Sequence, residues 1–225
     1  MERFTDLLFL AQVALLFGAV SWWLSPGRRP GRVMLALTGW VALLGFLSLE
    51  GFFANFKTMP PRILPALLVP LVAGLLFLRS GPTRDLLART PPQWPIYLQS
   101  FRVVMEIILW LLYLQHRAPV IMTFEGRNVD ILVGLTAIPV GYLCFARKAW
   151  SARVAFWWNV AGILILLNVV VHAQLSAPSP FRVFVTDPPL TFIAYWPYIL
   201  LPGFLVPLAW LGHAASLMQI RRSRA

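Results

Sequence analysis

The chain has 225 residues, of which 59% are hydrophobic and only 12% charged, and its formal net charge is +11. A soluble domain carries about 25% charged residues, so this composition excludes an ordinary soluble globule and places the chain in a membrane. The basic residues are spread over short segments between apolar runs and form no basic domain. This pattern excludes a nucleic-acid partner and favours contact with the headgroups of membrane lipids.

Seven apolar segments are predicted as membrane-spanning helices. They cover residues 5–24, 33–53, 63–78, 95–115, 129–146, 152–174 and 190–218. The first segment lacks a preceding basic region and a small-residue cleavage site, which favours a retained helix over a signal peptide. We therefore predict an all-α fold in which residues 1–225 form one domain, a single bundle of seven transmembrane helices. Small size and the lack of a targeting peptide favour a bacterial-type inner (plasma) membrane.

The connections between these segments predict the orientation of the chain. Twelve basic residues follow the first, third, fifth and last segments: Arg28, Arg29, Arg32, Arg79, Arg84, Arg89, Arg147, Lys148, Arg153, Arg221, Arg222 and Arg224. Six lie on the opposite side: Arg3, Lys57, Arg62, Arg117, Arg127 and Arg182. Because cytoplasmic loops are enriched in Arg and Lys, we predict an external N-terminus and a cytoplasmic C-terminus. Residues 25–32 are predicted as a tight turn and 83–89 as a short surface helix.

The fourth segment carries charges inside an apolar helix. At about 100° per residue, Gln99, Arg102, Glu106, Trp110 and Tyr113 form one stripe opposite a face of Val, Ile and Leu. A charge in hydrocarbon costs about 3 kcal/mol on insertion scales, so such residues normally face protein or a water-filled cavity. Arg102 and Glu106 have the i,i+4 spacing of an ion pair within one helix. The stripe predicts either a proton- or substrate-handling site or a structural ion pair, and both alternatives stay open.

A second polar group is predicted near the outer surface. It consists of Glu50, Glu125, Arg127, Asn128, Asp130, Asn168 and His172. Carboxylates and a histidine at one depth suit solute binding or proton relay. The alternative for Asn128 and Asp130 is that one of them caps the fifth helix.

Two further features concern the last two segments. Asn159 lies in the inner half of the sixth segment. Two roles are open for it: it belongs to the polar site at the depth of Arg102 and Glu106, or it forms a hydrogen bond to another helix. Pro197, Pro202 and Pro207 recur every five residues in the last segment. Each internal proline removes a helical hydrogen bond and bends the helix. The segment is therefore a candidate gate or hinge, and the alternative is a helix that packs around its prolines.

The sequence leaves the cofactor unknown. Retinal needs a lysine in the last helix, whereas Lys57 and Lys148 both lie in predicted loops. The spacing of carboxylates and histidines matches no metal motif such as HExxH, which disfavours a metal site. A haem held by two histidines is disfavoured as well, because His213 is predicted inside, away from His116 and His172 outside, and the remaining pair of His116 with His172 is a weak case.

Three functions remain open at this stage. The first is a small-solute or proton-coupled transporter, or a channel-like protein, whose polar path joins the outer group to Arg102 and Glu106. The second is a non-catalytic subunit, sensor or assembly factor that docks a protein partner, or a second copy of the chain, through the charged stripe. The third, less favoured, is an intramembrane enzyme that acts on a lipid or quinone, with Glu106 or His172 as general base.

Overall fold

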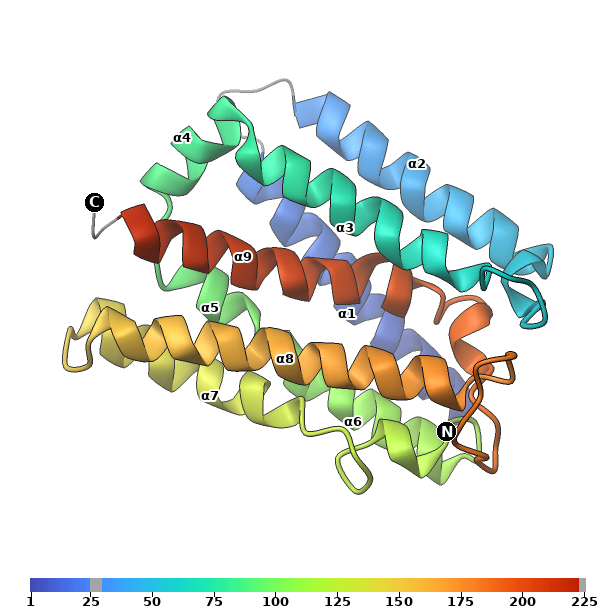
Figure 1. Ribbon diagram of the computed structural model, residues 1–225. Helices are drawn as coiled ribbons and strands as arrows, with labels where there is room; N and C mark the ends of the chain where they lie inside the picture. Colours follow the sequence, from blue (N-terminus) through green and yellow to red (C-terminus); the bar gives the residue numbers. More distant parts are fainter. Residues whose placement is uncertain (25–29, 223–225) are drawn as a thin grey trace.

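The computed structural model describes residues 1–24 and 30–222 as an all-helical fold, without a strand in those two ranges (Figure 1). The all-α prediction is confirmed. Most of the turn predicted at residues 25–32, including Arg28 and Arg29, lies outside the described residues, as does Arg224.

Helices occur at each of the seven apolar segments. The α-helices are α1 (Glu2–Leu24), α2 (Pro30–Leu49), α3 (Ile63–Arg79), α4 (Gly81–Arg89), α5 (Trp94–Leu98), α6 (Phe101–Leu114), α7 (Ile131–Gly141), α8 (Ala152–Ser176) and α9 (Val206–Arg222). π-Helical turns extend α7 through Tyr142–Ala146 and lead into α9 at Leu201–Leu205. The short surface helix predicted at 83–89 is present as α4.

Fewer than seven helices have the length of a membrane span. Four stretches in the described ranges are long and apolar enough: Glu2–Leu24, Trp94–Leu114, Ala152–Ser176 and Leu201–Arg222. A fifth is counted when α3 and α4, bent by 77° against each other, are taken as one span. The apolar parts of α2 and α7, Val33–Leu49 and Ile131–Ala146, are shorter. The chain is therefore a helical membrane protein with four or five candidate spans by length, and seven is not established.

The last helix starts later than the sequence predicts. The predicted span covers 190–218, but its first part forms a 3-10 turn (Phe192–Ala194) and irregular backbone, and the continuous span begins at Leu201. Pro197 and Pro202 lack the N–H that an α-helix needs, which explains the interruption. Most of the interrupted stretch is buried, including Leu190, Ala194 and Ile199, whereas Tyr195 and Trp196 are exposed.

Helix α9 lies between α3 and α8 and contacts α5 as well (Figure 1). Helix α6 packs against α1 and α7. The main hydrophobic core joins α1, α2, α6 and the stretch before α9. The N-terminus and the end of α9 lie at opposite ends of the bundle (Figure 1).

Candidate functional site

The polar stripe of the fourth predicted span faces the protein core. Gln99 is fully buried, and Arg102 and Glu106 are each only 2% exposed. Trp110 and Tyr113, further along the stripe, are half-buried. Large apolar residues on the opposite face of α6 are exposed, as expected for a surface in contact with lipid. Three of the five stripe residues are therefore buried, and in α6 two of them share the buried face with Met105, Ile108, Leu109 and Leu112.

The partners of the two charges come from another part of the chain. Arg102 Nη1 donates to Asp130 Oδ1 at 2.9 Å, and both residues are buried. Asn128 Nδ2 donates to Glu106 Oε1 at 2.6 Å. Within the described residues, Arg102 and Glu106 form no ion pair with each other, contrary to the pairing that their spacing predicts. We call these four residues, Arg102, Glu106, Asn128 and Asp130, the charged cluster.

The charged cluster also joins two groups that the sequence kept apart. Asn128 and Asp130 were predicted in an outer group, at a different depth from Arg102 and Glu106. With its π-helical extension, α7 has the length of 16 residues, which corresponds to about 24 Å. The hydrocarbon core of a bilayer is about 30 Å thick, so the first turn of α7 can lie below the surface. The loop before α7 places the side chains of Asn128 and Asp130 against Arg102 and Glu106 of α6.

Capping explains only part of the role of these residues. Asp130 occupies the N-cap position of α7, but its carboxylate makes no capping hydrogen bond. Asn128 Oδ1 instead accepts from the backbone N–H of Asp130 at 3.0 Å, and Asn128 Nδ2 also donates to the carbonyl of Met122 at 3.0 Å. Asn128 thus holds the loop in shape while it binds Glu106, and the Asp130 carboxylate remains free for Arg102.

Several buried polar atoms of this region have no hydrogen-bond partner among the described residues. They include Oε2 of Glu106, Nε and Nη2 of Arg102, and Oε1 of Gln99. An unsatisfied polar atom inside a membrane protein costs several kcal/mol. The Nε–Nη2 edge of a guanidinium is a fork of two parallel donors suited to an oxyanion or to ordered water. The charged cluster therefore has free binding capacity for a proton, for water or for a small polar ligand.

Close helix packing surrounds the charged cluster. A Cβ at Gly134 of α7 would lie 2.8 Å from the backbone N of Val103 and 3.3 Å from Arg102 Cβ. A Cβ at Gly212 of α9 would overlap the amide of Gln99, which donates to the carbonyl of Ala209 at 3.1 Å. These two glycines allow α7 and α9 to approach the stripe closely enough to exclude lipid from it.

A second polar network links α8 to α9. Asn159 Nδ2 donates to Ser216 Oγ at 2.9 Å and to the carbonyl of Ala155 at 2.7 Å, and Asn159 Oδ1 lies 2.8 Å from His213 Nδ1. All three side chains are buried, and His213 Nε2 has no partner. A Cβ at Gly162 would meet the imidazole ring, so Gly162 provides the space for it. Of the two roles predicted for Asn159, the structure shows the bond across to another helix.

Replacing Asn159 by alanine is expected to destabilise the protein by about 1–3 kcal/mol, because it leaves the buried His213 and Ser216 groups unpaired. The matched control is Asn168→Ala on the same helix, where one longer bond of 3.4 Å to the Arg127 carbonyl is lost. That control is expected to change the free energy of unfolding by less than about 0.6 kcal/mol. Unfolding titrations in detergent check both values, and equal losses would contradict the assignment.

The remaining outer residues hold the loop before α7 in place. Glu125 accepts from Trp110 Nε1 at 2.8 Å, and the guanidinium of Arg127 lies over the ring of Phe184 at 5.1 Å. His172 stacks on the same ring with centroids 5.4 Å apart. Asn168 binds the Arg127 carbonyl, as above, so Glu125, Arg127 and Asn168 anchor the loop before α7, and His172 contacts Phe184 of the segment after α8. Glu50 is exposed in the turn that ends α2, without a side-chain partner among the described residues.

The three prolines occupy different kinds of backbone. Pro197 lies in the irregular stretch, Pro202 in the π-helical turn and Pro207 at the start of α9. Pro207 has no N–H to donate to the Gly203 carbonyl four residues earlier, and Trp40 Nε1 donates to this carbonyl at 2.9 Å. The packing of these prolines is therefore established, whereas a gating movement stays a prediction.

Polar residues that the sequence did not single out form a further contact at the N-terminal end. Asp6 accepts from Arg117 Nη1 at 2.9 Å and from the hydroxyl of Tyr198 at 2.5 Å. Gln12 Nε2 donates to the Phe101 carbonyl at 2.7 Å. Gln12 could have been found from the sequence, because a glutamine within an apolar helix is unusual. Nothing local marks Asp6, because its partners lie more than 100 residues away.

Among residues 1–24 and 30–222, no three His, Cys, Asp or Glu side chains are grouped to hold a metal ion. No protein-family model, curated protein or solved structure matches the chain. Fold and function therefore rest on the chain's own geometry.

Proposed function

We propose that the protein is a proton-coupled transporter of a small polar solute, and that Glu106 is the group that gains and loses the proton. The observation that carries the proposal is the unpartnered Oε2 of a buried carboxylate, one helical turn from the unpartnered Nε and Nη2 of Arg102. Intramembrane ionisable groups of this kind commonly belong to ion pathways and proton relays.

The arrangement of buried polar groups suits a path through the bundle. Glu106 and Arg102 lie one turn apart on α6, and Gln99 precedes them in the turn between α5 and α6. Gln99 reaches α9 at Ala209 and Gly212, and the next residue is His213 with its free Nε2. We propose that the path runs on from Gln99 to this imidazole, so that a buried carboxylate and a buried imidazole mark its two ends. The loop anchored by Glu125 and Arg127 covers the charged cluster on the side of Asn128.

The charged stripe supports a core site better than a docking surface. Gln99, Arg102 and Glu106 are covered by the chain's own helices. A protein partner would need a free face of the stripe. A core site needs only access for a proton and a solute, which an alternating movement of the bundle provides.

The proposal includes the seven-span topology, with the N-terminus outside and the C-terminus in the cytoplasm of an inner-membrane bundle. The opposite positions of the two described ends agree with an odd number of crossings (Figure 1). The excess of arginine at the end that carries α4 and the α9 C-terminus agrees with the positive-inside rule. The shorter α2 and α7 would span with the help of the segments that flank them.

Glu106→Gln is expected to abolish proton flux while the fold is kept. A glutamine has nearly the same shape, and its Oε1 still accepts from Asn128, but it carries no titratable proton. Flux is measured with a pH-sensitive dye enclosed in vesicles that contain the purified protein. The matched control is Asp85→Asn, which removes the carboxylate of an exposed residue on α4, outside the charged cluster and the outer group, and is expected to keep the flux. Unchanged flux in a folded Glu106→Gln protein would refute the proposal.

A further inference from the structure

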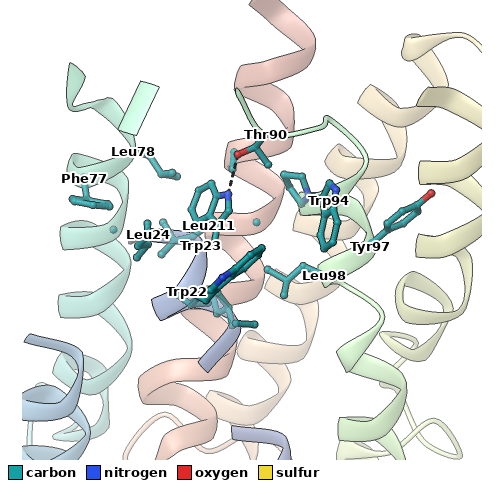
Figure 2. A pocket seen from close by; sticks show the side chains of 17 residues that line it. Trp22, Trp23, Leu24, Phe77, Leu78, Thr90, Trp94, Tyr97, Leu98 and Leu211 are labelled. Carbon is teal, nitrogen blue, oxygen red and sulfur yellow. Dashed lines mark hydrogen bonds between the residues drawn. The ribbon is translucent and has the colours of Figure 1, made fainter. Parts of the chain in front are cut away.

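An apolar cavity of about 370 Å³ lies where α1 and α3 end and α5 begins. In Figure 2, Trp22 and Trp23 of α1 lie between Phe77 and Leu78 of α3 on one side and Trp94 of α5 on the other. Its size falls within the roughly 300–1,000 Å³ of pockets that hold small organic ligands. No member of the charged cluster lines it, so it is separate from the site proposed above.

The lining of this cavity selects for hydrocarbon. Its one aliphatic hydroxyl, that of Thr90, is already used, because it accepts from Trp23 Nε1 at 2.9 Å and donates to the Leu86 carbonyl at 2.8 Å. The hydroxyl of Tyr97 points away from Trp22 and Trp23 (Figure 2). A polar solute that entered the cavity would lose its hydrogen bonds to water without replacement, whereas an alkyl chain loses none.

The cavity lies beside the most basic part of the protein. A second cavity, of about 400 Å³, shares Thr90 with the first and is lined in part by Gln219 and Arg222. Arg222 Nη1 donates to the backbone carbonyl of Arg84 at 2.9 Å, so the C-terminal turn of α9 is tied to α4. The described basic residues of this end are Arg79, Arg84, Arg89, Arg147, Lys148, Arg153, Arg221 and Arg222, and the one acidic residue in the same segments is Asp85.

Helix α4 has the geometry of an interfacial helix. It turns by 77° from α3, it buries Thr83 and Leu87, and it exposes Arg84 and Arg89. An amphipathic helix with arginines on its polar face lies in the plane of the headgroups and attracts anionic lipids. The tryptophans beside it suit the same depth of the bilayer, since their rings favour the interface.

We propose that the apolar cavity binds one acyl chain of an anionic phospholipid, whose phosphate lies against the arginines of α4 and Arg222. The two halves of the site correspond to the two halves of such a lipid. The apolar cavity takes the chain, and the adjoining basic rim takes the headgroup. A bound lipid of this kind would fix α1, α3, α5 and α9 relative to one another at this end of the bundle.

The proposal is tested with a phosphatidylglycerol that carries a photoreactive group near the end of one acyl chain. The purified protein is placed in phosphatidylcholine vesicles with a minor fraction of this probe, and cross-linked peptides are identified by mass spectrometry. We expect labelling to concentrate on cavity residues such as Trp23, Leu98 and Leu211. Ala19→Trp fills the cavity from an exposed position and is expected to abolish this labelling. Ala14→Trp, on an exposed part of the same helix outside the cavity, is the matched control and is expected to keep it.

The headgroup half of the site is tested with exposed residues, so that folding is not at risk. Arg84→Gln combined with Arg222→Gln is expected to remove the preference for the phosphatidylglycerol probe over a phosphatidylcholine probe with the same chain. Labelling spread evenly over the lipid-facing helices would indicate ordinary boundary lipid and overturn the proposal. Equal labelling of the unaltered protein by both probes, or displacement of the probe by an isoprenoid quinone but not by phosphatidylglycerol, would also overturn it.

Discussion

Replacing Asp130 by alanine is expected to destabilise the protein by about 3–5 kcal/mol, because removing one partner of a buried ion pair leaves an uncompensated buried charge. Arg102 is 2% exposed, and Asp130 is its one ionic partner among the described residues. The substitution also removes the side chain at the N-cap position of α7. Reversible unfolding of the purified protein in mixed micelles with increasing denaturing detergent measures the change.

Two further variants show whether the buried charge is the cause. Asp85→Ala removes an exposed carboxylate on α4 and is expected to change the free energy of unfolding by no more than about 0.5 kcal/mol. Arg102→Met combined with Asp130→Leu removes both charges and is expected to recover most of the loss, since apolar residues of similar volume often replace a buried pair without a penalty. If the double variant were no more stable than Asp130→Ala, the unpaired charge would not be the reason.

Gly126→Ala is expected to cost about 3 kcal/mol and to disconnect the loop from the charged cluster. A Cβ at this position would overlap the Val120 carbonyl and lie 2.7 Å from Ile121 Cα. Both neighbours are backbone atoms that have no side-chain freedom to move aside, which places the change at the upper end of overpacking penalties. The loop must open, and Asn128 and Asp130, which follow directly, are expected to withdraw from α6.

The control for this prediction is Gly18→Ala. A Cβ there would meet nothing within 4 Å, and the residue is exposed in the middle of α1. Alanine favours the helix by about 1 kcal/mol over glycine, so the control is expected to stabilise the protein. Unfolding titrations and the proton-flux assay check both variants together. A Gly126→Ala protein of normal stability with normal flux would show that the loop geometry is not required.

The charged cluster shows which features a local sequence pattern predicts and which it does not. The positions of Gln99, Arg102 and Glu106 on one buried face follow from helical spacing and the cost of exposing a charge to lipid, and both can be read from the chain. The partners of these residues could not be predicted in the same way. The sequence suggested that Arg102 and Glu106 pair within α6, whereas the structure pairs each with a residue that lies 22 or more positions along the chain.

The helices also divide into those that the sequence located and those that it did not. Apolar runs located α1, α3, α8 and the span that α5 and α6 form together to within a few residues, because the pattern is set by contact with lipid along their length. The stretch 190–200 is equally apolar, but most of it is buried in the core, where hydrophobicity does not require a continuous helix. Composition alone does not distinguish these two environments, so the predicted start of the last span was wrong.

By itself, the sequence determined that this protein is helical, that it lies in a membrane and that one face of residues 99–106 points away from lipid. These properties depend on hydrophobicity and on the helical repeat, which act over a few turns. Only the tertiary structure decided that the loop before α7 enters the bundle and supplies Asn128 and Asp130, and that an apolar cavity adjoins the basic end. Those features depend on the lengths, bends and close approach of helices that are distant along the chain.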